Sequence, residues 1–234
     1  MLMEKRFQEI LRILEEQGTV SVQDLTESLD ASEATIRRDL SQLAQMGKLK
    51  KIYGGAASLE TGYQTREIRV EERQELYVEE KKQIAKYAAS LIEPGDFVYV
   101  DAGSSTEYLV EYIEERDASY VTNSMSHALK LAGRGMKVSI LGGNVKGTTE
   151  AVVGADAMET LRRYHFTRGF WGADGIHKKE GCTTPEMEEA AVKRLSMKQT
   201  RDCYVLCDGS KFGKIAQVTF AELADVTVIT AGLK

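Results

Sequence analysis

The first 47 residues contain three short apolar stripes at helical spacing, separated by serine and glycine. The stripes are Phe7, Ile10, Leu11 and Leu14, then Val22, Leu25 and Leu29, then Ile36, Leu40 and Leu43. Ser21 and Ser32 precede the second and third stripes, where a hydroxyl can cap a helix, and Asp24 completes a capping box with Ser21. Three helices so close together, the last two joined by a tight turn, predict a helix-turn-helix domain.

A short basic stretch with a glycine pair, "GKLKKIYGGA" at Gly47–Ala56, follows the third helix and is typical of a wing hairpin. Residues 58–80 then lose apolar periodicity and are rich in Glu, Arg, Gln and Tyr, which indicates a linker. We therefore expect a winged helix-turn-helix domain at 1–57, a linker at 58–80 and a second domain at 81–234.

From Lys81 onward, helical stretches alternate with runs that favour β-strands. The strand candidates are Phe97–Val100, Ala118–Val121, Met136–Leu141, Phe166–Trp171, Cys203–Cys207 and Val226–Ile229. Alternation of this kind predicts an α/β domain with a mostly parallel sheet that helices cover on both faces.

Net charge, the length of apolar runs and the cysteine and histidine content restrict the classes of protein to which this chain can belong. The formal net charge is -5, and no stretch approaches the roughly 18 apolar residues that a membrane span needs, so we expect a cytoplasmic protein without a membrane partner. Three cysteines without a C-x-x-C pair and three scattered histidines indicate reduced thiols and no metal site. No sequence motif calls for a cofactor.

The arginine pair in "SEATIRRDLSQL" lies on the third predicted helix. At about 100° per residue, Arg38 points away from the apolar stripe and suits a base edge, whereas Arg37 lies on its flank and suits a phosphate. The alternative is a solvated face on which either arginine pairs with Glu33 or Asp39. Between Arg37 and Lys51 there are five basic residues against one acid, which favours DNA binding. The expected DNA contacts are Ser32, Ala34, Thr35, Arg37, Arg38, Ser41, Lys48, Lys50 and Lys51.

In the second domain, polar and glycine residues follow the predicted strands. The groups are Asp101–Thr106, Thr122–Asn123, Gly142–Gly143, Gly172–Gly175 and Asp208–Lys211. The carboxyl ends of parallel strands form one rim, where ligands bind. The first group offers hydroxyls and amides at a helix start, and it matches neither common nucleotide motif, so it predicts a site for a compact phosphate. The alternative is that Ser104 or Ser105 only caps the helix.

The stretch "GCTTPEMEEAAVKR" adds Glu186, Glu188, Glu189 and Lys193 on a helix that Thr184-Pro185 would start. A carboxylate and an ammonium near a phosphate site can bind sugar hydroxyls or act as acid and base. The alternative is that Glu189 and Lys193 form an ordinary i,i+4 surface pair. Because no histidine or serine–base arrangement lies near the rim motifs in sequence, we assign no catalytic residue.

These motifs carry a resemblance that covers nearly the whole chain. T-I-R-R-D-L at Thr35–Leu40 and the G-G-A after the wing resemble the DeoR family of bacterial sugar-operon repressors, and D-A-G-S-S-T, L-G-G, G-A-D-G-I and D-G-S-K-F-G resemble its effector domain. The resemblance implies a fold related to ribose-phosphate isomerases and coenzyme A transferases. The pocket residues that it implies are Asp101, Gly103, Ser104, Ser105, Thr106, Asn123, Gly142, Gly143, Asp174 and Lys211. Lys146 stands where many members have arginine.

The leading hypothesis is thus a repressor of a sugar-utilisation operon that binds operator DNA as at least a dimer and responds to a sugar phosphate. The run T-T-P-x-x-E-E-A-A-V-K-R resembles the fructose-operon branch, which implies fructose 1-phosphate. We add Lys146, Glu186 and Lys193 to the expected effector-binding residues. One alternative is an isomerase-like enzyme with a regulatory DNA-binding arm. Another is a DNA-binding protein whose second domain only oligomerises.

Overall fold

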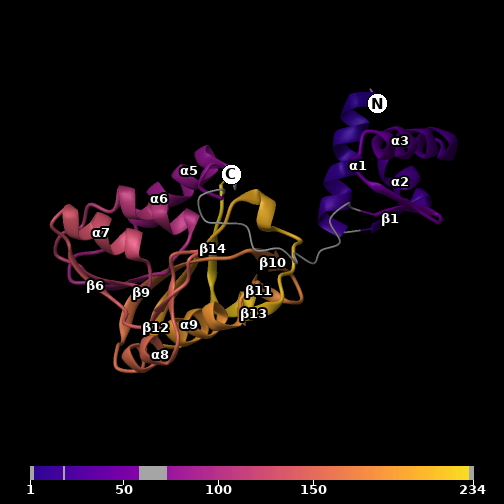
Figure 1. Ribbon diagram of the computed structural model, residues 1–234. Helices are drawn as coiled ribbons and strands as arrows, with labels where there is room; N and C mark the ends of the chain where they lie inside the picture. Colours follow the sequence, from indigo (N-terminus) through magenta and orange to yellow (C-terminus); the bar gives the residue numbers. More distant parts are fainter. Residues whose placement is uncertain (1–2, 18, 58–72, 232–234) are drawn as a thin grey trace. The chain divides into compact units, whose positions relative to one another are not determined.

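The computed structural model describes residues 3–17, 19–57 and 73–231 (Figure 1). The chain divides into two compact units. The small unit comprises Met1–Gln64 with Phe212–Lys214, and the large unit comprises Thr65–Lys211 with Ile215–Lys234.

The small unit is a winged helix-turn-helix, which confirms the predicted fold of this part. Its elements are α1 (Met3–Gln17), β1 (Thr19–Ser21), α2 (Val22–Leu29), α3 (Glu33–Gln45), β2 (Lys50–Ile52) and β3 (Gly55–Ala57). The predicted stripes meet in one core, in which Ile10, Leu25 and Ile36 are fully buried. The three strands form an antiparallel sheet in the order β1-β3-β2, so the wing hairpin gains a strand that the sequence pattern did not reveal.

Local signals fix the ends of these helices. Ser21 and Asp24 form both bonds of the capping box on α2, and the Ser32 hydroxyl accepts the Thr35 amide at the start of α3. The second glycine of the wing is required by close packing, because a Cβ on Gly55 would lie 2.0 Å from the Val20 carbonyl oxygen of β1.

The large unit is built on a six-stranded parallel sheet in the order β14-β12-β9-β4-β5-β6, which confirms the predicted α/β class. The strands are β4 (Phe97–Val100), β5 (Ser119–Thr122), β6 (Lys137–Ile140), β9 (Phe166–Gly172), β12 (Thr200–Leu206) and β14 (Thr227–Ile229). Each lies within a few residues of a run that the sequence pattern marked as a strand.

Helices cover both faces of this sheet (Figure 1). One face carries α5 (Val78–Ala89), α6 (Ser104–Tyr112) and α7 (Met125–Gly133), and the other carries α8 (Ala155–Leu161) and α9 (Met187–Lys198). Because side chains alternate along a strand, Val98 and Val100 enter the core beneath α5–α7, whereas Tyr99 enters the core beneath α8 and α9. Apolar residues at successive positions therefore reflect burial on both faces.

Several short elements lie outside the main sheet. They are β7 (Asn144–Val145) with β8 (Val152–Val153), the antiparallel sheet of β10 (Gly175–His177), β11 (Gly181–Thr184) and β13 (Val218–Ala221), and the 3-10 turns η1 (Gly209–Lys211) and η2 (Leu223–Asp225). The sequence pattern did not predict these strands, because they are two to four residues long. They matter because they carry polar side chains over the end of the main sheet.

The predicted linker lies only partly among the described residues. Residues 58–72 fall outside them. Residues 73–80, which we assigned to the linker from sequence, belong to the large unit, and α5 begins at Val78. Among the described residues, no helix is long and apolar enough to cross a membrane.

Candidate functional site

Helix α3 presents the arginine pair to solvent. Burial of Ile36, Leu40 and Leu43 leaves Arg37 and Arg38 exposed. Ser32 and Ala34 are also exposed at the start of the helix, and Thr35 and Ser41 are half-buried. The face that the wheel predicted for DNA contact is therefore the accessible face of α3.

The two acidic neighbours of the arginine pair, Glu33 and Asp39, form different contacts. Asp39 is buried and bonded to Arg6 of α1, so it does not neutralise Arg38 as the alternative required. Arg37 forms an ion pair of 2.6 Å with Glu33, and both side chains are more than half exposed. An exposed i,i+4 pair contributes little, which leaves the Arg37 guanidinium available to a phosphate.

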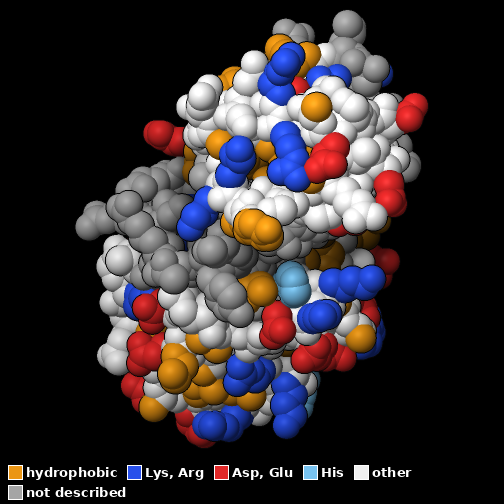
Figure 2. Space-filling view, turned by 90° about the vertical axis from the view of Figure 1, so that its right-hand side faces the viewer, with side chains coloured by type: hydrophobic (Ala, Val, Ile, Leu, Met, Phe, Trp, Pro, Cys, Tyr) orange, Lys and Arg blue, Asp and Glu red, His pale blue; other side chains and the backbone are white. Residues whose placement is uncertain are grey.

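The wing adds positive charge next to α3. Lys48, Lys50 and Lys51 are all exposed, and the Lys51 ammonium donates a bond of 3.0 Å to the Ser41 hydroxyl. This bond places the wing beside the exposed face of the helix. Figure 2 shows Lys and Arg side chains on the face of the small unit that is turned to the viewer. At the tip of the wing, the Tyr53 side chain is fully exposed.

In the large unit, contacts join the groups that follow the strands into one rim. The Ala102 amide donates to the Asn123 side chain at 2.8 Å, and the Gly172 amide donates to the Asp101 carboxylate at 3.4 Å. Gly142 and Gly143 lead into the β7–β8 hairpin, whose Val152 amide donates to the Asn123 carbonyl at 2.6 Å. The groups that follow β4, β5 and β9 are therefore in contact with one another, and the hairpin that follows Gly142–Gly143 contacts Asn123.

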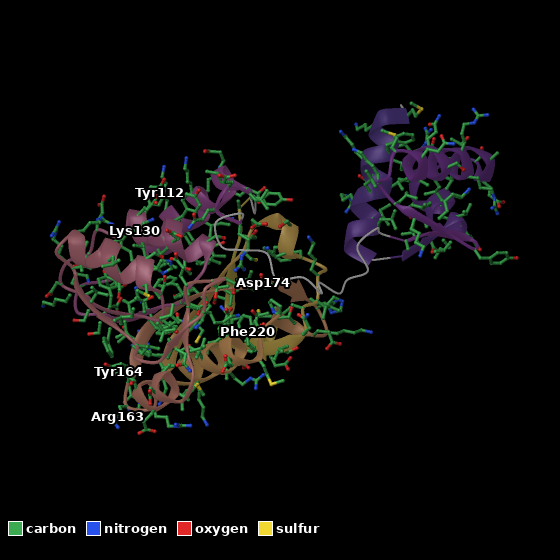
Figure 3. All side chains as sticks on the ribbon, in the orientation of Figure 1. Tyr112, Lys130, Arg163, Tyr164, Asp174 and Phe220 are labelled. Carbon is green, nitrogen blue, oxygen red and sulfur yellow. The ribbon has the colours of Figure 1, made fainter. Side chains whose placement is uncertain are left out.

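A buried ion pair lies at the centre of this rim. The Lys193 ammonium of α9 contacts the Asp101 carboxylate and donates to the Gly172 carbonyl at 3.1 Å. Both side chains are almost fully buried. Burial raises the pKa of Asp101 to about 6, although the adjacent Lys193 lowers it. Phe220 of β13 covers the pair, with its ring centre 5.4 Å from the ammonium, and Figure 3 shows Phe220 on the same side of the large unit as Asp174.

Glu189 belongs to a second cluster on α9. Its carboxylate accepts the Thr149 hydroxyl at 2.6 Å and the Lys146 ammonium at 3.0 Å, and Lys146 also lies 3.6 Å from Glu186. The alternative of a Glu189–Lys193 surface pair is therefore wrong. Both residues are buried and bind different partners, because the covering hairpin and the strand ends offer stronger contacts than the helix surface does.

The start of α6 is the predicted phosphate site. Its N-cap is Gly103, without a side-chain cap, so the alternative in which Ser104 or Ser105 merely caps the helix is wrong. Ser104 instead accepts the Lys81 ammonium at 3.1 Å. Thr106 is fully buried and its hydroxyl donates to the Gly103 carbonyl at 2.9 Å, so it supports the loop from within. The first amides of a helix have no intrahelical partner and can face an anion.

Sequence reasoning missed two basic residues at this position. Lys81 of α5 is 2% exposed, and burial lowers the pKa of its ammonium to about 8. The charge of Asp208 raises that pKa, and the charges of Lys211 and Arg73 lower it. One signal could have found Lys81: it precedes Ile84, Ala85 and Ala88 at helical spacing, so a lysine occupies the apolar stripe.

Arg73 is the second missed residue. Its guanidinium donates to the Asp174 carboxylate at 2.8 Å, and Asp174 also accepts the Thr184 hydroxyl at 3.1 Å. Within the part of the chain that the structure describes, the buried Nε of Arg73 has no hydrogen-bond partner. A buried donor without a partner is costly, and an anion bound at this position would supply one.

A histidine also lies at the rim, contrary to what the sequence spacing indicated. His127 of α7 is buried, and burial lowers its pKa to about 4 while a hydrogen bond to the Gly103 backbone raises it. The imidazole is therefore neutral at pH 7 and lies next to Gly103, at the start of the predicted phosphate site.

The arrangement suits a small phosphorylated polyol. Arg73, Lys81 and Lys211 provide positive charge around the α6 amides, which matches a phosphate dianion. The carboxylates of Asp101 and Asp174 and the amide of Asn123 lie along the same rim and can accept or donate hydrogen bonds to hydroxyl groups.

Comparisons with known proteins agree with both parts of this description. Residues 6–62 match the DeoR-like helix-turn-helix domain, and residues 77–232 match the DeoR C terminal sensor domain. The chain is 39% identical over 235 residues to the HTH-type transcriptional regulator FruR of Bacillus subtilis, covering 98% of this chain and 91% of that protein. It is 32% identical over 228 residues to the lactose phosphotransferase system repressor of Staphylococcus epidermidis, covering 96% and 90%.

Solved structures also show similarity. Ribose 5-phosphate isomerase A of Methanocaldococcus jannaschii aligns with 56% of this chain and 53% of that chain, at 15% identity and a TM-score of 0.43. Translation initiation factor eIF-2B of Pyrococcus horikoshii aligns with 97% and 87%, at 15% identity and a TM-score of 0.44.

Proposed function

The chain belongs to the DeoR family of bacterial sugar-operon transcriptional repressors, and on that premise we propose that it represses a sugar-utilisation operon under the control of a sugar phosphate. The small unit binds operator double-stranded DNA, and the rim of the large unit binds the effector. The protein works in the cytoplasm as at least a dimer, since helix-turn-helix proteins read paired half-sites.

The observation that carries the effector site is the buried cationic cluster at the start of α6. Among the described residues, no carboxylate is hydrogen-bonded to the buried Lys81 ammonium, although the charge of Asp208 raises its pKa, and the buried Nε of Arg73 has no hydrogen-bond partner. Burying positive charge is unfavourable unless an anion compensates it. A phosphate group at the α6 amides would supply that compensation, which supports a phosphorylated ligand over a neutral sugar.

The sugar part lies along the rest of the rim in this proposal. Asp174, Asn123 and the Asp101–Lys193 pair bind hydroxyl groups, and the cluster of Lys146, Glu186 and Glu189 borders the far end. We take fructose 1-phosphate as the first candidate, because the T-T-P-x-x-E-E-A-A-V-K-R run resembles the fructose-operon branch and a relative bears the name FruR.

A thermal-shift screen tests the effector. The purified chain is heated with phosphorylated hexoses and pentoses, the matching unphosphorylated sugars and inorganic phosphate. We expect one sugar phosphate to raise the melting temperature, since a ligand that binds only the folded state stabilises it. Stabilisation by the unphosphorylated sugar alone, or by none of the compounds, would contradict the proposal and favour a rim that only serves assembly.

The enzyme alternative has less support. The curated relatives reported above are regulators or repressors, and we propose that this chain is likewise not an enzyme. The buried Asp101–Lys193 pair is the feature that an isomerase could use, so the same sugar phosphates are incubated with the chain and the products are separated by chromatography. Turnover by the wild type that a sample of folded Lys193→Met lacks would establish the alternative.

The DNA contact of α3 gives a first prediction. Replacing Arg38 by alanine should cost about 1–3 kcal/mol on operator DNA and relax the base preference, because the exposed guanidinium suits a bidentate base contact. Lys50→Ala, on the wing, should weaken operator and random DNA equally. Titrations of both duplexes at fixed salt measure the difference. An equal loss on both duplexes for Arg38→Ala would assign that side chain to the phosphate backbone.

The lowered pKa of Lys81 gives a second prediction. At pH 8 about half of the empty sites hold a neutral amine, because the pKa is about 8. A phosphate dianion favours the ammonium form, so binding should take up as much as about half a proton at pH 8 and none through this lysine at pH 6.5. Calorimetry in two buffers of different ionisation enthalpy measures the uptake. Lys81→Arg, which stays charged, should bind without it.

A further inference from the structure

We propose that residues 73–81, here called the clasp, transmit occupancy of the effector site to the DNA-binding unit. The inference rests on the proposed effector site and adds how that site is coupled to repression. The clasp directly follows residues 58–72, which connect the two units along the chain. A change in the contacts of the clasp therefore occurs directly next to residues 58–72 in the chain.

The clasp is fastened to three different parts of the rim. Arg73 donates to Asp174, which follows β9, and the Gly209 amide after β12 donates to the Glu80 carboxylate at 3.0 Å. On α6, the Gln74 side-chain amide donates to Glu107 and the Tyr108 hydroxyl donates to the Gln74 carbonyl at 3.1 Å. The clasp thus bridges the elements that surround the phosphate site.

The charges around the empty site act in both directions. The charge of Asp208 favours the Lys81 ammonium, and the like charges of Lys211 and Arg73 disfavour it. Among the described residues, the Lys81 ammonium donates hydrogen bonds to uncharged oxygens, namely the Arg73 carbonyl and the Ser104 hydroxyl. Burial outweighs the effect of Asp208, so the ammonium is only partly compensated in the empty site.

A bound phosphate would complete this compensation. Its two negative charges attract Arg73, Lys81 and Lys211, and the Arg73 Nε, which has no hydrogen-bond partner among the described residues, gains an acceptor. Effector binding therefore tightens the clasp on the rim. The ligand favours the tight state of the clasp over the loose state. Because DNA affinity differs between these two states in this proposal, binding of the effector changes DNA affinity.

Two clasp contacts do not involve the cationic cluster. The bond from Gln74 to Glu107 and the bond from Tyr108 to the Gln74 carbonyl use neutral donors and do not include the side chains of Arg73, Lys81 or Lys211. The double variant Gln74→Ala/Tyr108→Phe loosens the clasp without removing a phosphate ligand. Tyr112→Phe is the matched control for Tyr108→Phe, since it removes a tyrosine hydroxyl one turn later on α6. Figure 3 labels Tyr112, whose ring centre lies 5.3 Å from the Lys86 ammonium.

The test measures the full-length chain with fructose 1-phosphate and, as a second probe, inorganic phosphate. Hydrogen exchange of residues 73–81 should slow when the probe binds. Operator affinity should fall about 5- to 150-fold on addition of fructose 1-phosphate in the wild type and in Tyr112→Phe. In Gln74→Ala/Tyr108→Phe the response should shrink by as much as about tenfold, or be lost where the wild-type response is smaller than that, as expected for two lost hydrogen bonds, while binding of fructose 1-phosphate is retained.

Thermal shift in the same samples separates the two claims. Absence of binding by any sugar phosphate counts against the proposed function. Binding that leaves the exchange of residues 73–81 unchanged overturns the clasp, and so does a double variant that responds as the wild type does.

Discussion

Replacing Lys193 by methionine is expected to lower the free energy of unfolding by about 3–5 kcal/mol, because it leaves the buried Asp101 carboxylate without its counter-ion. Urea denaturation at pH 7 measures the loss. The substitution keeps the length of the side chain, so the effect reports charge and not a cavity. Lys198→Met, at the exposed end of the same helix, should change stability by less than about 0.5 kcal/mol.

The loss of stability in Lys193→Met should be larger at high pH than at low pH. Burial already raises the pKa of Asp101 to about 6, and removal of Lys193 raises that pKa further. A carboxyl whose pKa is higher in the folded state than in the unfolded state binds protons on folding, so its favourable contribution is lost as pH rises through the folded pKa. Lys193→Met should therefore be less destabilised at pH 5 than at pH 8. Asp101→Asn/Lys193→Met should recover much of the stability, and a deficit independent of pH would contradict this account.

Replacing Lys81 by methionine is expected to weaken binding of the sugar phosphate by about 2–5 kcal/mol, roughly 30- to 5,000-fold. The reason is the loss of a buried ammonium that donates to Ser104 beside the proposed phosphate position. Calorimetry with the best compound of the thermal-shift screen measures the affinity. Operator binding without effector should be unchanged, and release by effector should be lost.

The neighbouring lysine supplies the control. Lys82 is partly exposed and pairs with Glu79 at 3.1 Å, so Lys82→Met should leave effector affinity within about twofold. Lys81→Met should fold normally, because burial disfavours the charged form of Lys81 in the empty site. Equal affinities for Lys81→Met and the wild type would place the phosphate elsewhere on the rim.

Local chemistry determined much of the small unit. The apolar stripes, the capping serines and the wing glycines act over a few residues, so the sequence predicted three helices and a hairpin in the correct places. Exposure of Arg38 follows from the same periodicity, because burial of Ile36 and Leu40 fixes the rotation of α3. Helical periodicity does not predict that Asp39 pairs with Arg6, because the two residues lie 33 positions apart in the sequence.

The rim was also accessible to sequence reasoning, for a topological reason. All strands of a parallel sheet end at the same edge, so groups following β4, β5, β9 and β12 had to converge without knowledge of the strand order. The resemblance to one family then supplied the nature of the ligand.

Only the tertiary structure decided which charged side chains meet. Lys193 pairs with Asp101 across 92 residues instead of with Glu189 one turn away, and Arg73 reaches Asp174 across 101 residues. Such pairings depend on strand order, on which helix covers which face of the sheet and on the free-energy cost of burying an unpaired charge. The spacing of residues along the chain predicts none of these factors. For this protein, the sequence determined the helices and strands and the sheet edge at which the polar groups gather, and the packing of those elements determined the arrangement of charges around the proposed effector site.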